Sequence, residues 1–398
     1  MAKLFIEDLQ VQGKRVIMRC DFNVPLKDGH VDSDKRLRES LPSIRYLISK
    51  GARLVLMSHL GRPKGVTESL RMAPVAKALS DLLGIPVKSL PDCIGPEIEA
   101  AVAALKDGEV LLLENLRFHP EEEKNDPAFA GQLAKLADIY VNDAFGTAHR
   151  AHGSTEGITR YLKLNAAGYL MKKELDFLGG ALDQPKRPFV SIIGGSKISG
   201  KIDVIEALLP KVDKLLIGGG MAYTFLKSQG EEIGKSLCEA DKVGMAADLL
   251  KRAQGKIQLP IDYKVTSSLD FKALKLGSPL QTVKRGALPA DMESVDVGPE
   301  TVKLYSQIIK DAKTVVWNGP MGVFEIEESA AGTFGVAQAL AEATATGTIT
   351  IIGGGDSASA IEKAGLESKV SHVSTGGGAS LEFLEGKTLP GVAALTEK

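Results

Sequence analysis

Net charge, aromatic side chains and long apolar runs are all scarce in this sequence, and each scarcity disfavours a class of protein. The 398 residues carry 49 Lys plus Arg against 50 Asp plus Glu, a net charge of -1. Nucleic-acid and anionic-membrane binders need a broad basic surface, so we expect neither partner. Aromatic residues make up only 5%, which disfavours stacking platforms for single strands. No apolar run approaches the roughly 18 residues of a membrane span.

Cysteine is scarce as well. Cys20, Cys93 and Cys238 lie far apart and form no CxxC pair. They therefore predict neither a disulfide framework nor a sequence-recognisable zinc site, and they fit a reducing compartment. The first ten residues are charged within three positions and contain no apolar leader, so we expect a cytoplasmic rather than an exported protein.

Glycine is abundant, at 42 of 398 residues, and the chain alternates short β-branched runs with Ala/Leu/Lys/Glu-rich segments. That alternation predicts an α/β fold with parallel sheets. The expected strands are 15–22, 52–59, 109–116, 138–145, 189–195, 214–220, 257–265, 314–320 and 348–355. The expected helices include 72–83, 127–137, 239–253 and 328–346. A helix over about 169–182, ended by Gly179–Gly180, is the expected spacer between two domains.

Ligands of open α/β sheets bind outside the carboxyl ends of the strands. In the first half, each of four consecutive strand ends is followed by polar or cationic residues: Asp21, Asn23, His59, Arg62, Arg117, His119, Asp143, His149, Arg150 and His152. In the second half, the strand ends are followed by glycine pairs and triplets. A single polar residue or glycine after a strand is usually an ordinary loop residue. The prediction of ligand sites therefore depends on the repetition of such residues after several strands. This repetition predicts two anionic ligands, one held by side-chain cations and one by backbone amides.

The sequence does not match either of two common nucleotide-binding motifs in full. Residues 195–201 fit GxxxxGK, but Ile202 follows where a P-loop needs Ser or Thr for Mg²⁺. The dinucleotide pattern GxGxxG is absent in its proper context. Residues 353–358 place Asp356 after a glycine triplet, where it suits a phosphate-bound Mg²⁺ better than a ribose. No His/Cys/carboxylate cluster in the sequence predicts a tighter metal site.

Nine motifs in order resemble the phosphoglycerate kinase family over the full length: RCDFNVP (19–25), SHLGRP (58–63), LLENLRFH (112–119), NDAFGTAHRAH (142–152), GGSKISGK (194–201), IGGGMAYTF (217–225), WNGPMGVFE (317–325), GGGDSA (353–358) and STGGGASLEFLEGKTLPG (374–391). The resemblance implies two doubly wound, Rossmann-like parallel-sheet domains facing a cleft and joined by a helix. The implied domains are 1–168 with a returning tail at about 385–398, an interdomain helix at 169–187, and 188–384.

The family's reaction is the reversible transfer of a phosphoryl group from 1,3-bisphosphoglycerate to ADP, which gives 3-phosphoglycerate and ATP with Mg²⁺. The resemblance implies a monomer whose first domain binds the glycerate. Asp21 and Asn23 would hold the glycerate, and four basic residues would surround its 3-phosphate. The implied substrate residues are Asp21, Phe22, Asn23, Arg36, His59, Leu60, Gly61, Arg62, Arg117 and Arg150.

The second domain would bind the nucleotide, with Glu325 at the ribose and Asp356 at Mg²⁺. The implied nucleotide residues are Lys201, Gly218, Gly219, Gly298, Asn318, Glu325, Gly354, Gly355, Asp356 and Ser357. The implied catalytic residues, which face the transferring group, are Arg36, Lys197, Lys201, Gly376 and Gly377.

Two departures from the family pattern are visible, Cys20 and Gly200, and neither replaces a contacting side chain. The residues alone leave two other hypotheses for the function. A nicotinamide dehydrogenase would explain two α/β halves with glycines after strands, but not the cationic strand ends. A hinged, non-catalytic binding protein would explain two domains, but such proteins are typically exported.

Overall fold

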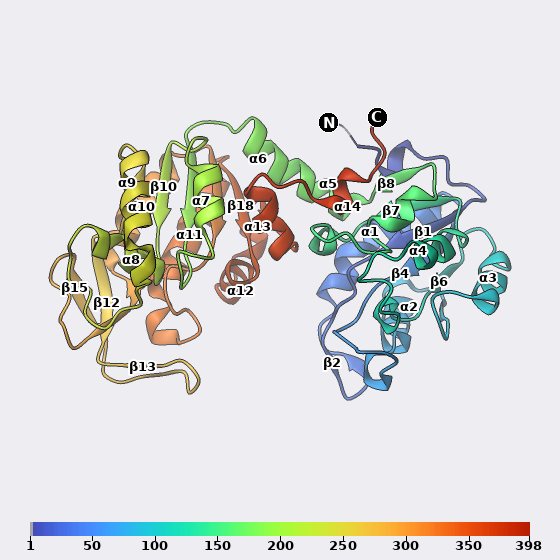
Figure 1. The fold of residues 1–398 in the computed structure, drawn as a ribbon, viewed down its shortest axis with the longest axis horizontal. Helices are drawn as coiled ribbons and strands as arrows, with labels where there is room; N and C mark the ends of the chain where they lie inside the picture. The colour runs from blue at the N-terminus through green and yellow to red at the C-terminus, as the bar shows by residue number, and fades with distance from the viewer. Residues whose placement is uncertain (1–2) are drawn as a thin grey trace. The chain divides into compact units, whose positions relative to one another are not determined.

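The computed structural model describes residues 3–398 as two compact units. The first unit extends to Asp176 and includes Thr388–Lys398, and the second is Phe177–Lys387. The division between them falls inside the segment expected to join two domains. Figure 1 follows the chain through both units. None of the helices in this part of the chain has the length and apolar character needed to cross a bilayer.

The first unit is built on a six-stranded, wholly parallel sheet in the order β5-β6-β4-β1-β7-β8. Its strands are β1 (Arg15–Arg19), β4 (Arg53–Met57), β5 (Val87–Ser89), β6 (Val110–Leu112), β7 (Ile139–Asn142) and β8 (Asn165–Ala167). The central strands are buried along almost their whole length, as expected for a sheet covered on both faces. A short antiparallel pair, β2 (Leu26–Lys27) and β3 (His30–Val31), follows β1.

Apolar stripes bury the helices of this unit against the sheet. In α1, Leu37, Leu41 and Ile44 lie at i, i+4 and i+7 and are all buried. The helices are α1 (Lys35–Ser49), α2 (Ala73–Leu83), α3 (Pro96–Ala103), α4 (Pro127–Ala134), α5 (Tyr169–Glu174) and α14 (Pro390–Ala393). Short 3₁₀ turns are η1 (Ile6–Asp8), η2 (Glu68–Leu70), η3 (Leu116–Phe118), η4 (Phe145–Thr147) and η5 (Gly157–Arg160).

The second unit repeats the design with a six-stranded parallel sheet in the order β11-β10-β9-β17-β18-β19. Its strands are β9 (Phe189–Ile193), β10 (Lys214–Ile217), β11 (Ile257–Gln258), β17 (Thr314–Asn318), β18 (Ile349–Gly353) and β19 (His372–Val373). Numbered within the sheet, this order is 3-2-1-4-5-6, the doubly wound order whose direction reverses between the first and fourth strands, here β9 and β17. The α/β fold class predicted from the sequence is confirmed.

The helices of the second unit cover this sheet and share a core in which Trp317 and Tyr305 are fully buried. They are α6 (Gly180–Asp183), α7 (Ile202–Leu208), α8 (Met221–Ser228), α9 (Val243–Arg252), α10 (Pro299–Asp311), α11 (Ala331–Ala345), α12 (Gly355–Lys363) and α13 (Gly378–Leu384). The 3₁₀ turns are η7 (Ala240–Lys242), η8 (Glu327–Ser329) and η9 (Glu367–Lys369).

An antiparallel subdomain was not anticipated. It consists of the sheet β15-β12-β16 and the hairpin β13–β14. Its strands are β12 (Asp262–Thr266), β13 (Leu269–Asp270), β14 (Lys275–Leu276), β15 (Gln281–Lys284) and β16 (Glu293–Val297). The single strand expected over 257–265 is therefore wrong. It divides into β11 and β12 around Pro260, which has no N–H to give to a sheet ladder.

The helix at the seam also differs from the expectation. Helix α5 passes into a π-helical segment, η6 (Leu175–Gly179), and then into α6. Gly179 has φ -63° and ψ -46°, which are right-handed helical angles, so the glycine pair lies inside the helix rather than ending it. A glycine ends a helix when its φ is positive, and here it is not.

The two ends of the chain lie together in the first unit (Figure 1). Leu4 N–H donates to the Thr396 carbonyl at 2.8 Å, and Thr396 N–H donates to the Asn165 carbonyl at 2.9 Å. A bridge joins Lys3 to Glu397. Residues near both ends of the chain therefore hydrogen-bond to β8, the edge strand of this sheet.

Asp143, the residue after β7, is a buried carboxyl group beside the start of α5. Its Oδ1 accepts from Met171 N–H at 3.1 Å, and a Cβ at Gly168 would come within 2.3 Å of it. Burial raises the pKa of Asp143 to about 6 from the usual 3.8. The Asp143 carboxyl group therefore ionises at a lower pH in the unfolded chain than in the folded protein.

Stability should reflect this difference in pKa. Below both pKa values Asp143 lowers the stability in neither form, and between pH 3.8 and about 6 the folded state loses stability, by about 3 kcal/mol once the pH is above 6. Denaturant unfolding of wild type and Asp143→Asn at pH 4 and pH 8 should show wild type losing stability relative to the variant at the higher pH. Asp183→Asn, at an exposed position, controls for the loss of one carboxylate. A gap between wild type and Asp143→Asn that is the same at both pH values would contradict the assignment.

Candidate functional site

The turn after β1 carries polar side chains and is held by hydrogen bonds to the segment that follows β4. Phe22 N–H donates to Ser58 Oγ at 2.8 Å, which buries the Phe22 ring and leaves Asp21 and Asn23 at the surface. Asn23 Oδ1 accepts from Gly61 N–H at 2.8 Å. The structure thus brings the predicted DFN segment against the predicted HLG segment, as expected for parallel strands that end at one edge.

Arg19, the last residue of β1, precedes this turn and is only 1% exposed although it is charged. Its guanidinium donates to Ser154 Oγ at 2.8 Å, to the Cys20 carbonyl, and to His59 Nδ1 at 3.0 Å. A guanidinium can only donate, so His59 Nδ1 must accept and the ring proton must sit on Nε2. Burial, followed by the charge of Arg19, holds the pKa of His59 well below its usual range. His59 is therefore a neutral N–H donor at pH 7.

Glu122 compensates the charge of Arg19 through one shared residue. The carboxylate is fully buried and accepts both Ser154 N–H at 2.8 Å and Ser154 Oγ–H at 2.5 Å. Arg19 donates to the same hydroxyl. A buried cation thus reaches a buried anion through a serine, which satisfies the polar groups of both.

Further basic groups surround His59. The charges of Arg36 and Arg117 act to lower its pKa, and those of Arg117 and Arg150 act to lower the pKa of His152, which burial brings to about 4, so His152 is also neutral at pH 7. Arg117 has a side chain only 5% exposed, donates to the Gly61 carbonyl at 3.0 Å, and has a pKa lowered first by burial. Arg19 and Arg150 repel Arg117, and Glu123, 3.3 Å from its Nε, offsets only part of that repulsion, so a bound anion would relieve the rest.

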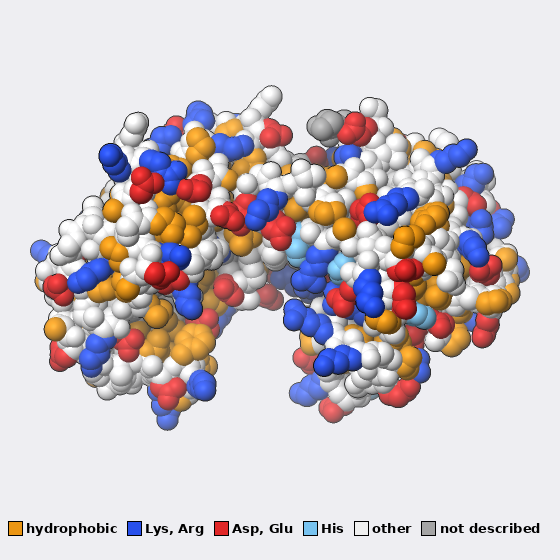
Figure 2. Space-filling model, in the orientation of Figure 1, with side chains coloured by type: hydrophobic (Ala, Val, Ile, Leu, Met, Phe, Trp, Pro, Cys, Tyr) orange, Lys and Arg blue, Asp and Glu red, His pale blue; other side chains and the backbone are white. Residues whose placement is uncertain are grey.

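Arg36, in the first turn of α1, is the member of this cluster with the closest anionic partner. Its Nη1 lies 2.5 Å from Asp21 Oδ2. Arg62 and Arg150 are exposed. Leu60, which precedes Gly61 in the sequence, is buried. Figure 2 shows Lys and Arg side chains next to histidines on the surface of this unit.

In the second unit, glycine allows two strand ends to pass each other closely. A Cβ at Gly194 would lie 2.1 Å from the Pro320 carbonyl oxygen, and one at Gly219 would lie 2.5 Å from the Gly195 carbonyl oxygen. Gly219 also has φ +68°, a left-handed angle that favours glycine. These glycines allow close backbone packing at the point where the strand order reverses.

Lys201 lies at the N-cap of α7 and reaches across this switch point. Its Nζ donates to Asn318 Oδ1, and Asn318 Nδ2 donates to the Gly353 carbonyl at 3.0 Å. Ser357 Oγ accepts from Gly319 N–H at 2.6 Å. Burial lowers the pKa of Lys201, and the carboxylates of Asp356 and Glu385 oppose that shift. Lys197, by contrast, is exposed.

A pocket of about 320 Å³ opens beside these residues. Its lining combines glycine backbone, apolar side chains and two carboxylates: Gly195, Gly219, Gly322, Leu237, Phe271, Glu325 and Asp356 among others. Phe271 and Leu237 are each 55% exposed, and both lie on the lining of the pocket, where an apolar ligand group could cover them.

Not every predicted nucleotide residue lines that pocket. Gly218 and Gly298 are buried outside its lining, and a Cβ at Gly298 would lie 2.3 Å from the Asp262 carboxylate. Gly354 has φ +88°, and Gly355 begins α12. Gly376 N–H donates to Ser374 Oγ at 3.1 Å, and Gly377, with φ +52°, caps the short helix α13.

Asp356 offers one exposed carboxylate at the start of α12. Mg²⁺ commonly uses one or two protein carboxylates and takes its other ligands from substrate phosphates and water. The donor set therefore fits a Mg²⁺ ion carried mainly by a nucleotide.

Sequence reasoning missed Arg19, Glu122, Leu237 and Phe271. Arg19 left a detectable signal, since it is the one charge between apolar residues near the end of the strand run 15–22. Phe271 left none, because its exposure depends on the unanticipated hairpin β13–β14.

Comparison with known proteins gives the same family along the whole chain. The family model described as phosphoglycerate kinase matches residues 6–387. Curated phosphoglycerate kinases of Chlorobaculum tepidum and Moorella thermoacetica are 58% and 59% identical over 402 residues, covering all of both chains. The solved phosphoglycerate kinase structure from Coxiella burnetii superposes with a TM-score of 0.89 at 41% identity, covering 98% of each chain.

The tautomer of His59 is directly measurable. We expect nitrogen-15 NMR to find its ring neutral, with the proton on Nε2, from pH 8 down to pH 6, because Arg19 occupies Nδ1 and burial opposes a charge. His30, in an exposed hairpin, provides the internal comparison. A His59 ring that gains a second proton near pH 6.5 would show that Arg19 does not hold it in this form.

Proposed function

The chain belongs to the phosphoglycerate kinase family, and we propose that the two residue sets described above divide that family's reaction between the two units. The protein is a kinase that transfers a phosphoryl group reversibly from 1,3-bisphosphoglycerate to ADP, giving 3-phosphoglycerate and ATP in glycolysis. The observation that carries the assignment of the sites is the cluster of arginines around the neutral His59. Neither rival reading, a dehydrogenase or a binding protein, accounts for both that cluster and the family match.

The first unit would bind the phosphoglycerate. Its 3-phosphate would lie among Arg62, Arg117 and Arg150, where the neutral Nε2–H of His59 adds a directed donor without adding charge. Asp21 and Asn23 would accept from and donate to the glycerate hydroxyl and carboxylate. Arg19 would act behind them as a positioning residue, since it touches His59 and not the surface.

The second unit would bind the nucleotide in the 320 Å³ pocket. The adenine would lie between the exposed apolar side chains of Leu237 and Phe271, with Glu325 at the ribose. Lys201 and the start of α12 would meet the phosphates, because an ammonium and unpaired helix N–H groups both favour anions. We propose Asp356 as the protein ligand of Mg²⁺, which when bound withdraws charge from the nucleotide phosphates.

The chemistry needs charge stabilisation more than proton transfer. In the direction that consumes ATP, the nucleophile is the 3-phosphoglycerate carboxylate, which is already ionised at pH 7, so no general base is required. Arg36 and Lys201 would neutralise the oxygens of the phosphoryl group in transit, and the backbone around Gly376 and Gly377 would add N–H donors. His59 cannot serve as an acid, because its proton stays on Nε2 as part of a neutral ring.

Donor and acceptor would bind on different units, so transfer requires the units to approach each other and exclude water. We propose that the helix from α5 to α6 accommodates that movement. Small-angle scattering with both ligands bound checks it, and no compaction would count against it. We further propose a cytoplasmic monomer that does not bind nucleic acid, as the family role and balanced charge favour, and light scattering tests the monomer.

Arg36→Ala should lower kcat by about 10² to 10³-fold, since its charge is needed most when the phosphoryl oxygens are in transit. Steady-state kinetics with MgATP and 3-phosphoglycerate measures this. Arg62→Ala is the matched control, because loss of an outlying phosphate contact should raise KM for 3-phosphoglycerate with little change in kcat. An unchanged kcat in Arg36→Ala would refute its role. A raised KM for ATP in Arg62→Ala would show that the units had been assigned in reverse.

Asp356→Asn should weaken the Mg-nucleotide and raise the Mg²⁺ concentration needed for half-maximal rate, because an amide is a poorer ligand for a hard cation. Titration of Mg²⁺ at fixed ATP measures the shift. Glu362→Gln removes a carboxylate from the same helix outside the pocket and should leave the titration where it was. Identical Mg²⁺ curves for wild type and Asp356→Asn would remove Asp356 from the metal site.

A further inference from the structure

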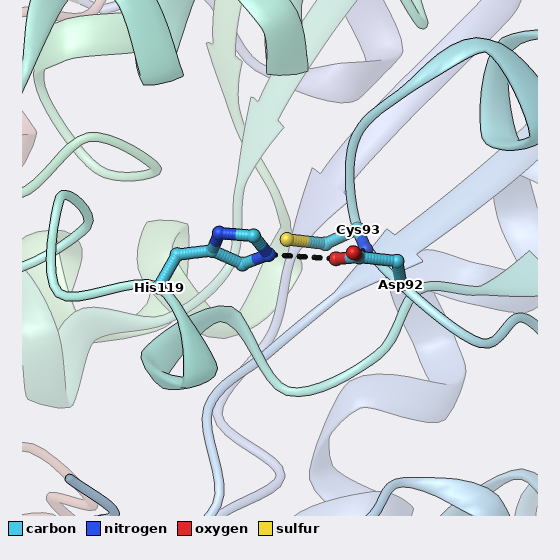
Figure 3. A group of neighbouring side chains, drawn as sticks. All are labelled: Asp92, Cys93 and His119. Atoms are coloured by element: carbon cyan, nitrogen blue, oxygen red, sulfur yellow. Dashed lines mark hydrogen bonds and ion pairs between the residues drawn. The ribbon is translucent and has the colours of Figure 1, made fainter. Parts of the chain in front are cut away.

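A second, chemically different site lies in the first unit, where three side chains converge. Figure 3 shows Cys93 Sγ and the Asp92 carboxylate pointing toward the same edge of the His119 ring. One ligand atom from each, Sγ, a carboxylate oxygen and a ring nitrogen, lies within 4.8 Å of the other two. Asp92 and Cys93 follow β5, and His119 follows η3, so the sequence spacing gave no sign of the cluster.

The three groups are held in place by separate contacts. Cys93 N–H donates to Asp92 Oδ1 at 2.6 Å, and the Asp92 carbonyl accepts from Glu114 N–H at 3.3 Å. His119 N–H donates to the Leu116 carbonyl at 3.2 Å, and its ring lies 5.4 Å from that of Phe129. His119 Nε2 meets Asp92 Oδ1 at 2.7 Å.

The donor types select among metals. Thiolate sulfur, imidazole nitrogen and carboxylate oxygen together are the ligands of Zn²⁺ and related transition ions, whereas Mg²⁺ and Ca²⁺ take oxygen.

We propose that Asp92, Cys93 and His119 form a binding site for a divalent transition-metal ion of the Zn²⁺ class, distinct from the nucleotide's Mg²⁺. Three protein ligands leave a fourth tetrahedral position for water. Coordination replaces the thiol proton, which passes to solvent, and gives a metal–thiolate bond.

Movements of about 1 Å form the site. Ligands of a tetrahedral Zn²⁺ lie about 3.3–3.6 Å apart, so the His119–Asp92 pair must open by under about 1 Å, and ligand atoms as far as 4.8 Å apart must close by about 1 Å. The Asp92 and His119 side chains are 49% and 27% exposed, which gives the ion a path from solvent and lets the pair adjust. Cys93 is fully buried and forms the floor of the site.

The test uses the full chain, freed of metal and kept reduced, with Co²⁺ as the optical probe. Wild type should bind one Co²⁺ per chain, with a thiolate-to-cobalt charge-transfer band and the intense visible bands of tetrahedral cobalt, and Zn²⁺ should displace it. Cys93→Ser should abolish the charge-transfer band. Asp92→Asn and His119→Gln should each weaken Co²⁺ binding by at least about tenfold.

Cys238→Ser is the matched control, since Cys238 is an exposed free thiol outside the cluster, and its titration should follow wild type. Asp92 has an exposed side chain, so Asp92→Asn keeps the test valid if Cys93→Ser does not fold. Absence of Co²⁺ binding to wild type would overturn the proposal. So would a thiolate band that survives in Cys93→Ser or is lost in Cys238→Ser.

Discussion

Parallel pairing releases every strand of a sheet at the same edge, and both units depend on that constraint. In the first unit it brings the segments after β1, β4 and β7 together, although Asp21, His59 and Arg150 are far apart in the chain. In the second it places the turns after β9 and β17 close enough that only glycine fits between them. The chemistry of each site follows from which residues the sequence places at those turns.

Much of this could be predicted from the sequence because strand ends can be recognised locally. Apolar runs followed by Asp21, His59 or Gly353–Gly355 indicate both the sheet and its functional edge, and the motif resemblance supplied the reaction. Two predictions failed for different reasons. Pro260 divides an expected strand because proline has no N–H for the sheet ladder, a local signal that the apolar pattern obscured. The Gly179–Gly180 pair continues a helix because neighbours in space decide the backbone angles there.

The buried polar groups show most clearly why a sequence leaves a site incomplete. Arg19 reads as one charge near the end of a strand, yet it fixes the proton on His59 and is itself balanced by Glu122 through Ser154. Four distant segments contribute to that chain of contacts. The same holds for Asp92, Cys93 and His119, whose proximity exists only after β5 and η3 have been placed. Local sequence patterns cannot predict contacts between side chains that are distant in the sequence.

The return of the C-terminal residues to the first unit has a consequence for synthesis. Thr388–Lys398 complete the unit that contains residue 4, while Phe177–Lys387 form the other unit without interruption. A ribosome therefore delivers all the residues of the second unit before the first has its closing contacts at Thr396 and Glu397. Although domains commonly fold in the order in which they are made, here the first to begin is the last to be finished.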